Sequence, residues 1–283
     1  MNVILCGANG YIGSRVYEVL NKDFNFFPID NLIIKRDKYN FVKLKDYRKL
    51  SSEDLNKFDV CLWLCGHSSV KQSIDNPSEA FSNNTTGLIE LSKKFDGTII
   101  YASSGSVYNN STGLCDENEL IYNATNVYDF SKFVIDEYFK LDSSKFISLR
   151  FGTVNGFSKS FRDELMLNKM SLDSMINKKI SVSNQDAFRP VLYIEDLIKC
   201  IKILLQNHID LRENIFNLCS MNYTIGEYAN SVKNYFNSSL EILNDTKTYS
   251  FQMSNHKFSK LCNFKFTTDI NEILNNIKIN LNK

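Results

Sequence analysis

The sequence predicts an α/β protein built on a doubly wound, parallel β-sheet, with a smaller lobe toward the C-terminus. Three observations lead to this fold class. Short apolar runs alternate with helical patterns from Asn2 to Phe151, the first run stands directly at the N-terminus, and the alternation loosens after Phe151 into stretches rich in Asn, Lys and Ser. Alternating strands and helices form βαβ units, whose consecutive strands are parallel.

The strand candidates of the first half are short runs of apolar residues. They cover 2–6, 26–30, 40–44, 60–65, 98–103 and 146–151. Three segments between them carry apolar residues every three or four positions, as helices packed on a sheet do. These helices are expected at 11–20, 76–95 and 127–141.

The loosened part of the chain still contains regular elements. A helix is expected at 195–205, a strand at 214–219 and a helix at 224–236. We therefore expect residues 1–155, joined by about 188–220, to form the sheet domain. Residues 156–187 and 221–283 would form the smaller lobe.

Composition and charge exclude several classes of protein. The 283 residues are 43% hydrophobic, enough for a large core, and 33 Lys and Arg nearly cancel 32 Asp and Glu, so no overall field favours nucleic acid or an acidic membrane. The longest apolar run, 60–65, is far shorter than the roughly 20 residues of a membrane helix. Three scattered histidines and no Cys/His set with zinc-site spacing predict no bound metal. Seven irregularly spaced cysteines and no leader-like segment predict a cytoplasmic protein with free thiols.

Three glycines, Gly7, Gly10 and Gly13, directly follow the first strand candidate and open the first helix, with Tyr11 and Ile12 between them. In such a turn one glycine permits the tight bend, another lets backbone amides approach a pyrophosphate, and a third lets the helix pack on the strand. The helix N-terminus then faces the phosphates. The strand before and the helix after predict a dinucleotide site of the Rossmann type, with an incidental glycine turn as the alternative.

The acidic residues at the ends of the next two strand candidates bear on the identity of the dinucleotide. Asp30 stands where a carboxylate accepts hydrogen bonds from the adenosine ribose, and it would repel a 2′-phosphate, so it favours NAD over NADP. Lys35 and Arg36 follow closely and could bind that phosphate if the loop folded back, which leaves NADP open. Asp46 is a candidate acceptor for the adenine amino group, or else a solvated surface acid.

A candidate catalytic pair, Tyr128 and Lys132, is four residues apart at the start of a strong helical pattern, so both side chains share one helix face. An ammonium beside a phenol stabilises the phenolate, which lets the tyrosine accept or donate a proton nearer neutral pH. Ser103 and Ser104 follow the apolar strand residues 98–102 at the carboxyl edge of the sheet, where a hydroxyl can bond the same substrate oxygen. Tyr108 is a rival base, but no charged residue lies four positions after it, so packing or substrate contact suits it better.

Two later segments complete a series of motifs: Leu-Arg-x-x-x-Val-Asn-Gly at 149–156 and Arg-x-x-x-Tyr-Ile-x-Asp at 189–196. Together with the glycine set, the Asp30-Asn31 strand end, Ser-Ser-x-x-Val-Tyr at 103–108 and Tyr-x-x-x-Lys at 128–132, they resemble the extended short-chain dehydrogenase/reductase family, the NAD-dependent epimerase/dehydratase group. The likeness runs through almost the whole chain. Asn155 and Tyr193 depart from the usual tyrosine and histidine, which leaves the substrate contacts there open.

The resemblance implies roles for further residues of the sheet domain. Ser104, rather than Ser103, would be the catalytic serine, because it lies four residues before Tyr108 as in the family. Asn84 matches the family's Asn-x-x-Gly, which props the active site. Cys65-Gly66 stands where the family places small residues beside the cofactor.

The resemblance also implies substrate contacts in the lobe. Asn168 resembles the asparagine that contacts the sugar phosphate, with a helix-surface amide as the alternative. Arg189 resembles the arginine that reaches the diphosphate, and a guanidinium fork suits phosphate. An ion pair that packs the lobe is the alternative for Arg189.

The activity that the resemblance implies is NAD(P)-dependent hydride transfer on a nucleotide-diphosphate sugar, at C4 as in a 4-epimerase. A 4-ketoreductase or dehydrogenase is the alternative, and a catalytically idle, NAD-binding regulatory protein is the alternative of another class. Dehydratases of the family carry Asp-Glu, or at least Glu, directly after the catalytic hydroxyl residue, whereas Gly105 and Ser106 stand here, so no 4,6-dehydratase activity is expected. Family members usually form homodimers through two helices, here 77–95 and 128–141.

Overall fold

The computed structural model describes residues 1–32, 38–68, 70–109, 111–119, 124–142, 145–212, 214–246 and 248–282. Its centre is a seven-stranded sheet in the order β11-β7-β5-β4-β1-β2-β3, in which all neighbouring strands are parallel. The strands are β1 (Asn2–Cys6), β2 (Asn25–Asp30), β3 (Lys43–Leu44), β4 (Val60–Trp63), β5 (Thr98–Ser104), β7 (Phe146–Phe151) and β11 (Asn214–Leu218). The strand order runs outward from β1 in both directions, which confirms the doubly wound α/β fold.

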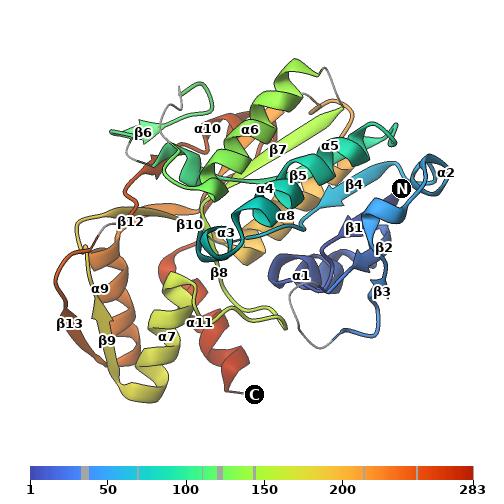
Figure 1. Cartoon of the computed structure of the whole chain (residues 1–283). Helices are drawn as coiled ribbons and strands as arrows, with labels where there is room; N and C mark the ends of the chain where they lie inside the picture. The colour runs from blue at the N-terminus through green and yellow to red at the C-terminus, as the bar shows by residue number, and fades with distance from the viewer. Residues whose placement is uncertain are drawn as a thin grey trace.

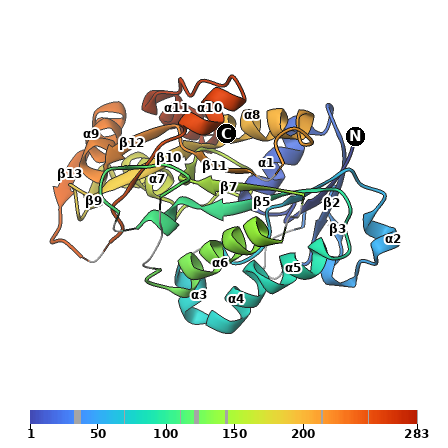
Figure 2. The same ribbon diagram turned by 90° about the horizontal axis from the view of Figure 1, so that it is seen from above.

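Helices cover both faces of this sheet (Figures 1 and 2). On one face lie α1 (Tyr11–Leu20), α8 (Ile194–Gln206) and α10 (His256–Leu261); on the other lie α4 (Pro77–Asn84), α5 (Thr86–Ser92) and α6 (Val127–Leu141). Successive side chains of β1 point to opposite faces of the sheet. Val3 packs in the core with α1 and α8, and Ile4 packs in the core with α5 and α6. The sheet edge at the carboxyl ends of the strands remains for the site.

Most of the other helices and strands form the lobe, which lies beside the sheet domain at lower left in Figure 1. The helices α7 (Met166–Asn177), α9 (Ile225–Phe236) and α11 (Ile270–Leu281) pack together, next to the strand pair β9 (Lys179–Val182) and β13 (Ser239–Ile242). The strands β8 (Thr153–Asn155), β10 (Phe188–Tyr193) and β12 (Met221–Thr224) form a second sheet, and β6 (Leu114–Cys115) pairs with β14 (Gln252–Met253). Short helices occur at η1 (Tyr47–Lys49), α2 (Ser52–Leu55), α3 (Val70–Asp75) and η2 (Gly105–Tyr108). The exact division of the chain into two domains stays a prediction.

Several predicted elements differ in extent from those in the structure. The helix expected at 76–95 is two helices, because Thr85 leaves helical geometry (φ −123°, ψ −74°) and its hydroxyl donates to the carbonyl of Phe81. The strand expected at 60–65 ends at Trp63, before the turn at Gly66, whose φ is +117°. The strand expected at 40–44 is reduced to Lys43–Leu44.

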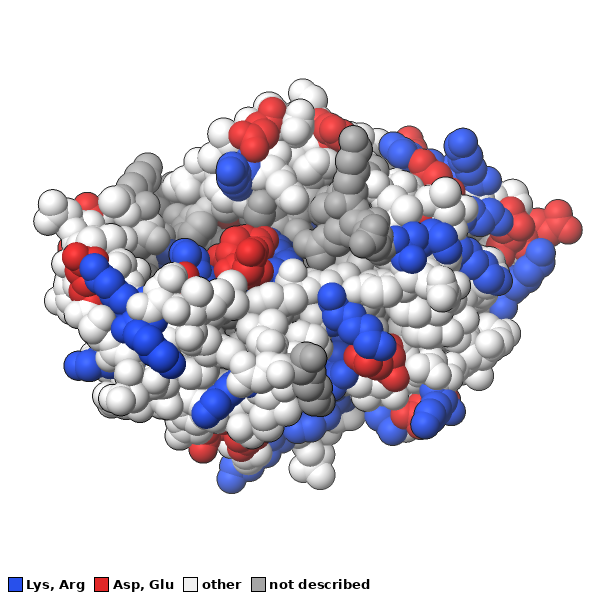
Figure 3. All heavy atoms as spheres, turned by 90° about the horizontal axis from the view of Figure 1, so that it is seen from below, with Lys and Arg blue, Asp and Glu red and all other residues white. Residues whose placement is uncertain are grey.

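Surface charge and hydropathy are those of an ordinary globular protein. Figure 3 shows Lys and Arg side chains interspersed with Asp and Glu over one face, with a hollow near its middle. None of the helices in the described ranges combines the length and hydropathy needed to cross a bilayer. The described residues also contain no group of three His, Cys, Asp or Glu side chains arranged to hold a metal ion.

Candidate active site

The glycine turn after β1 depends on close approach of backbone segments. The φ of Gly7 is +85°, and the amides of Gly7 and Ala8 both donate to the carbonyl of Ile29, at 3.0 and 3.1 Å. A Cβ on Gly13 would lie 2.1 Å from the Gly7 carbonyl oxygen, and one on Gly7 would lie 2.7 Å from that of Leu64. Any side chain at these two positions would push the helix or the neighbouring strand end away.

A cavity of about 450 Å³ opens over this turn. The helix α1 begins at Tyr11, and Gly10 before it has no side chain to cap the helix, so the amides of the first turn remain for an anionic ligand. Asp30 also lines the cavity, and its carboxylate accepts from the amides of Asn9 (3.0 Å) and Leu32 (2.8 Å), which fixes it at the end of β2. The predicted cofactor residues that line the cavity are Gly7, Gly10, Tyr11, Ile12, Gly13, Asp30, Asn31, Cys65 and Gly66. An uncapped helix N-terminus and a carboxylate in one cavity fit the phosphates and the ribose of a dinucleotide.

Three further residues were expected near the cofactor: Asp46 at the adenine, and Lys35 and Arg36 at a 2′-phosphate. Asp46 lies beside the cavity, but its carboxylate accepts hydrogen bonds from the guanidinium of Arg48, at 2.6 to 3.0 Å, which lower the pKa of Asp46. Its contact with adenine stays a prediction. Lys35 and Arg36, the candidate ligands of a 2′-phosphate, lie outside the described residues.

Asn84 holds the turn beside the cavity against the helix α6. Its side-chain oxygen accepts from the amide of His67 (2.9 Å), and its side-chain nitrogen donates to the carbonyl of His67 (3.2 Å) and to the hydroxyl of Ser131 (3.0 Å). A Cβ on Gly66 would lie 2.4 Å from that Asn84 oxygen. This geometry suits the propping role that the resemblance implied for Asn84.

The structure brings Ser104, Tyr128 and Lys132 together at the carboxyl edge of the sheet. Ser104 ends β5, and the other two occupy the first turns of α6. The Lys132 ammonium donates to the carbonyl of Ala102 (2.8 Å) and lies 5.9 Å from the centre of the Tyr128 ring. Burial lowers the pKa of Lys132 to about 8, against the opposing charge of Asp136. Burial raises the pKa of Tyr128, and the neighbouring Ser104 side chain opposes that rise. In the protein alone, Tyr128 is therefore a proton donor at neutral pH.

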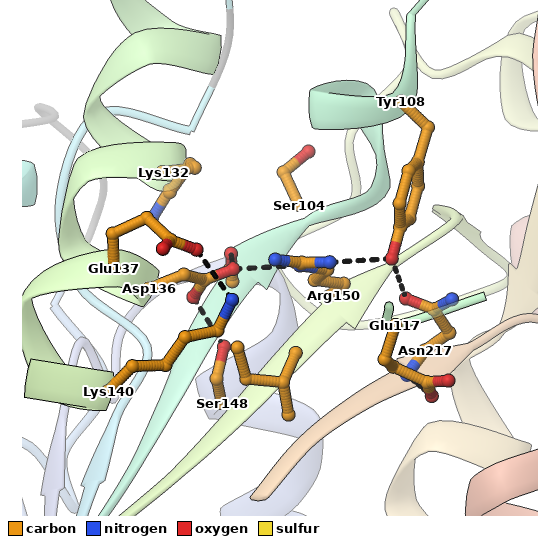
Figure 4. A network of polar contacts seen from close by, with 12 residues as sticks. Ser104, Tyr108, Glu117, Lys132, Asp136, Glu137, Lys140, Ser148, Arg150 and Asn217 are labelled. Atoms are coloured by element: carbon orange, nitrogen blue, oxygen red, sulfur yellow. Dashed lines mark hydrogen bonds and ion pairs between the residues drawn. The ribbon is translucent and has the colours of Figure 1, made fainter. Parts of the chain in front are cut away.

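A buried ion pair lies beneath these residues (Figure 4). The Asp136 carboxylate on α6 accepts from Arg150 Nε on β7 at 2.8 Å, and both side chains are almost completely buried. Three hydroxyls also donate to Asp136, those of Tyr101 (2.8 Å), Ser148 (2.6 Å) and Ser103 (3.1 Å). The hydroxyl of Ser103 is thus engaged inside the protein, whereas Ser104 faces Tyr128.

The same ion pair engages Tyr108, the rival base. Its hydroxyl accepts from Arg150 (2.6 Å) and donates to the side-chain oxygen of Asn217 (2.9 Å), as Figure 4 shows. Tyr108 is completely buried, and burial raises its pKa to about 12. This residue therefore packs the structure and is not placed as a proton acceptor.

A second polar cluster, which the sequence analysis missed, extends from Ser104. The hydroxyl oxygens of Ser104 and Ser106 are 2.8 Å apart, and Ser106 donates to Asp129 Oδ1 at 2.5 Å. The other carboxylate oxygen of Asp129 accepts from Asn126 (2.6 Å) and from the Tyr249 hydroxyl (3.1 Å). Burial raises the pKa of Asp129. The signals in the sequence were an acid directly after Tyr128 and a hydroxyl two residues after Ser104.

The two lobe residues differ in what they offer a ligand. Asn168 is completely buried, and its amide is used within the protein: it accepts from the amide of Gly156 (2.9 Å) and donates to the carbonyl of Arg162 (2.9 Å) and the hydroxyl of Tyr11 (3.4 Å). Its contact with a sugar phosphate stays a prediction. Arg162 itself lines the cavity and was not expected there.

Arg189 is partly buried, and its guanidinium is incompletely bonded. One terminal nitrogen donates to the hydroxyl of Thr248, and the other is buried and has no hydrogen-bond partner among the described residues. The guanidinium carbon lies 5.3 Å from the centre of the Tyr249 ring. Burial lowers the pKa of Arg189 to about 10, and no carboxylate in the described part of the chain forms an ion pair with it. An anionic ligand would supply the missing partner.

Comparison with known proteins gives concordant matches. A model of the NAD dependent epimerase/dehydratase family matches residues 3–219. The chain is 25% identical over 264 residues to an ADP-L-glycero-D-manno-heptose-6-epimerase of Brachyspira hyodysenteriae, covering 83% of this chain and 81% of that protein. It is 27% identical over 217 residues to a putative UDP-glucose 4-epimerase of Methanocaldococcus jannaschii, covering 70% and 71%. The fold superposes on UDP-glucose 4-epimerase of Thermotoga maritima, solved with UDP-glucose, with a TM-score of 0.86 and 16% identity over 100% of this chain and 99% of the other.

Proposed function

Because this chain belongs to the NAD dependent epimerase/dehydratase family, we propose that it is a nucleotide-sugar 4-epimerase, which inverts C4 of a nucleotide-diphosphate sugar. It is an NAD-dependent enzyme of the extended short-chain dehydrogenase/reductase type. Beyond the family, we propose the carbon that is inverted, C4, and the class of substrate, a nucleotide-diphosphate sugar. Both relatives compared above by sequence are epimerases by name, one of them a putative 4-epimerase.

The guanidinium of Arg189 has no ion-pair partner among the described residues, and this observation supports a nucleotide-diphosphate sugar as the substrate. Burying a cation without a partner costs free energy, and a diphosphate offers two charged oxygens that match the guanidinium fork. The free terminal nitrogen of Arg189 is buried beside Tyr249, whose hydroxyl reaches Asp129 next to Tyr128. A diphosphate on Arg189 would therefore lie on the side of the catalytic residues where the sugar must be.

Tyr128, Lys132 and Ser104 have separate roles in the proposed reaction. Gly7, Gly10, Gly13 and Asp30 would hold NAD, which would supply the acceptor and donor of the hydride. Tyr128 exchanges the proton of the sugar hydroxyl, Lys132 supplies the positive charge that favours the phenolate, and Ser104 bonds the same oxygen. The Asp30 carboxylate in the cavity favours NAD, which suits an enzyme that retains its cofactor between the two hydride transfers.

The test begins with the nucleotide that the purified protein retains. We would denature the protein, identify the released nucleotide by mass, and then follow conversion of UDP-glucose into UDP-galactose by chromatography, with ADP- and CDP-hexoses alongside. Bound NAD and epimer formation are expected, and Tyr128→Phe should lower kcat by at least about 100-fold. An empty site with NADPH-dependent reduction of a 4-keto sugar would replace the proposal with the ketoreductase. Bound NAD without turnover of any nucleotide sugar would favour the idle regulatory protein.

We also propose that the protein is a homodimer formed through α4 and α6. On the outer face of α6, Phe130 is 47% exposed and stacks on Phe81 of α4, with ring centres 5.8 Å apart, and Ile74 of α3 is 67% exposed. Light scattering of the same preparation should give twice the chain mass of 32.7 kDa, and the mass of a single chain would contradict the dimer. The cytoplasmic location stays a prediction.

A further inference from the structure

We propose that Arg162 binds the diphosphate of NAD from the lobe and thereby retains the cofactor in its cavity. The inference rests on the proposed function in one respect, since an enzyme that uses one NAD for both hydride transfers must hold it between them. Arg162 ends a segment of residues 156–162, here called the strap, which leads from β8 toward α7. In Figure 1 this segment extends from the lobe toward α1.

The strap is hydrogen-bonded to the glycine turn and to the start of α1. Three bonds of 2.7 Å join them: the hydroxyl of Tyr11 donates to the carbonyl of Gly156, that of Ser158 to the carbonyl of Tyr11, and that of Ser160 to the carbonyl of Asn9. Because these bonds use hydroxyls and carbonyls, they leave the amides at the N-terminus of α1 for a ligand. The strap is therefore held against the glycine turn by its own contacts.

The side chain of Arg162 joins the strap to a second wall of the cavity. Its Nη1 donates to the hydroxyl of Ser68, in the segment after β4, at 3.2 Å, and both residues line the cavity. Its Nε donates to the exposed carboxylate of Glu164 at 2.7 Å. The other terminal nitrogen, Nη2, has no hydrogen-bond partner among the described residues. Since 3.2 Å is at the long end of hydrogen-bond distances, a charged acceptor can take both terminal nitrogens.

The charges along the cavity wall favour this position for a phosphate-binding cation. Three carboxylates line the cavity, those of Asp30, Asp75 and Glu79, against two basic side chains among the described Lys and Arg residues, Arg162 and Lys45. The amide of Lys45 donates to the carbonyl of Asp30 at 3.0 Å, which places Lys45 beside the carboxylate expected at the ribose. Arg162 instead follows the strap residues bonded to the N-terminus of α1, where a diphosphate is expected.

The arrangement makes release of NAD depend on the lobe. The glycine turn offers backbone amides with partial charges, whereas Arg162 offers a full charge on a fork that matches two phosphate oxygens. In the proposed complex Arg162 exchanges its bond to Ser68 for bonds to phosphate, while Glu164 keeps Nε and so orients the fork. The sheet domain and the lobe would then hold the cofactor together.

Four variants separate a bond to the diphosphate from other roles of Arg162. Arg162→Gln removes the charge, and Arg162→Lys keeps a charge but not the fork. Ser68→Ala removes only the partner that Arg162 has in the protein alone. Arg15→Gln is the matched control, because Arg15 is a cation of α1 that pairs with Glu18 and Glu195 and does not line the cavity.

The first readout is the rate at which bound NAD exchanges with isotopically labelled NAD, followed by mass on protein saturated with NAD and without any sugar. Arg162→Gln should exchange at least about 10-fold faster than the native protein, because it lacks a charge-assisted bond to the cofactor. Arg162→Lys should lie between the two, and Ser68→Ala and Arg15→Gln should stay within about twofold of the native rate. An unchanged rate in Arg162→Gln would overturn the inference. Equal acceleration in Ser68→Ala would also overturn it, since Arg162 would then act by closing the cavity against Ser68.

Calorimetric titration locates the bond on the cofactor. Native protein and Arg162→Gln, freed of nucleotide with charcoal, are titrated with ADP-ribose, which contains the diphosphate, and with adenosine, which lacks it, by competition with ADP-ribose. The Kd for ADP-ribose should rise at least about 10-fold in Arg162→Gln, and the Kd for adenosine should stay within about twofold. An equal loss for both ligands would show a structural role and overturn the inference.

The same variants distinguish this inference from the proposed function. An unchanged Kd for ADP-ribose with a raised KM for the nucleotide sugar would place Arg162 at the substrate and overturn the bond to the cofactor. Faster exchange of NAD in Arg162→Gln, in a protein that inverts no nucleotide sugar, would support the bond to the diphosphate and fail the proposed function instead.

Discussion

The helix α6 carries two buried carboxylates two turns apart, Asp129 and Asp136, and their surroundings differ in one respect. Asp136 faces the guanidinium of Arg150, at 2.8 Å, with three hydroxyls around the pair. Asp129 is bonded by two hydroxyls and an amide but by no cation among the described residues. A neutralising charge fixes a buried carboxylate as an anion, whereas neutral donors alone leave it able to accept a proton.

The difference follows from where each residue lies over the sheet. Seven residues span about two helical turns, so both side chains leave α6 on nearly the same face. Asp136 lies over the strands, where Arg150 projects from β7, as Figure 4 shows. Asp129 lies in the first turn, beyond the end of β5, where η2 and the segment around Tyr249 approach it. The middle of the helix thus carries the ion pair, and its N-terminal end carries a carboxylate that is bonded by neutral donors.

The largest expected effect comes from breaking the structural pair. Asp136→Asn leaves the Arg150 charge buried without its carboxylate partner, so we expect the free energy of unfolding to fall by about 3–5 kcal/mol. Urea denaturation at neutral pH measures it. The matched control is Glu137→Gln on the same helix, because Glu137 forms an exposed pair with Lys140 and should cost less than about 1 kcal/mol. A loss for Asp136→Asn no larger than this control would contradict the structural assignment.

The sequence predicts the sheet and the catalytic pair better than it predicts the contacts of either carboxylate. Strand alternation, the glycine turn and the Tyr128/Lys132 spacing are local patterns, and the sheet confirms the fold that they predict. The contact between Ser106 and Asp129 joins residues 23 positions apart, and only the path of η2 after β5 brings them together. No local spacing encodes that path.

The helix α7 of the lobe was not predicted, and the reason is different. The helix α7 buries Asn168, Ser171 and Ser174 beside its apolar residues, so the apolar stripe that reveals a helix is interrupted. These polar side chains are satisfied by contacts within the protein, such as that of Asn168 with Gly156, which only the folded chain supplies. The break at Thr85 likewise depends on geometry that the apolar spacing of 76–95 does not record.

An intermediate effect is expected from Asp129→Asn, and its dependence on pH sharpens the contrast with Asp136. Folding raises the pKa of Asp129, so the native protein loses stability as pH rises from the unfolded-state value through the raised folded-state value. Each unit by which folding raises that pKa amounts to about 1.4 kcal/mol. The variant lacks this loss. Its stability relative to the native protein should therefore increase as pH rises from about 4 to 8, measured by urea denaturation at several pH values. A relative stability that decreases over that range would show that Asp129 is held as an anion.

The smallest effect is expected from Tyr249→Phe, which removes one donor to Asp129 but keeps the ring on which Arg189 stacks. The lost hydrogen bond should cost about 1 kcal/mol of unfolding free energy at neutral pH. Because that bond favours the carboxylate, its loss should raise the pKa of Asp129 further. Infrared difference spectra between the protein and its Asp129→Asn variant isolate the band of the protonated carboxyl, and the pH midpoint of this band should move to higher pH. A midpoint that moves to lower pH would mean that a new charge or water replaces the tyrosine hydroxyl. A stability loss as large as that of Asp136→Asn would show that both ends of α6 are structural.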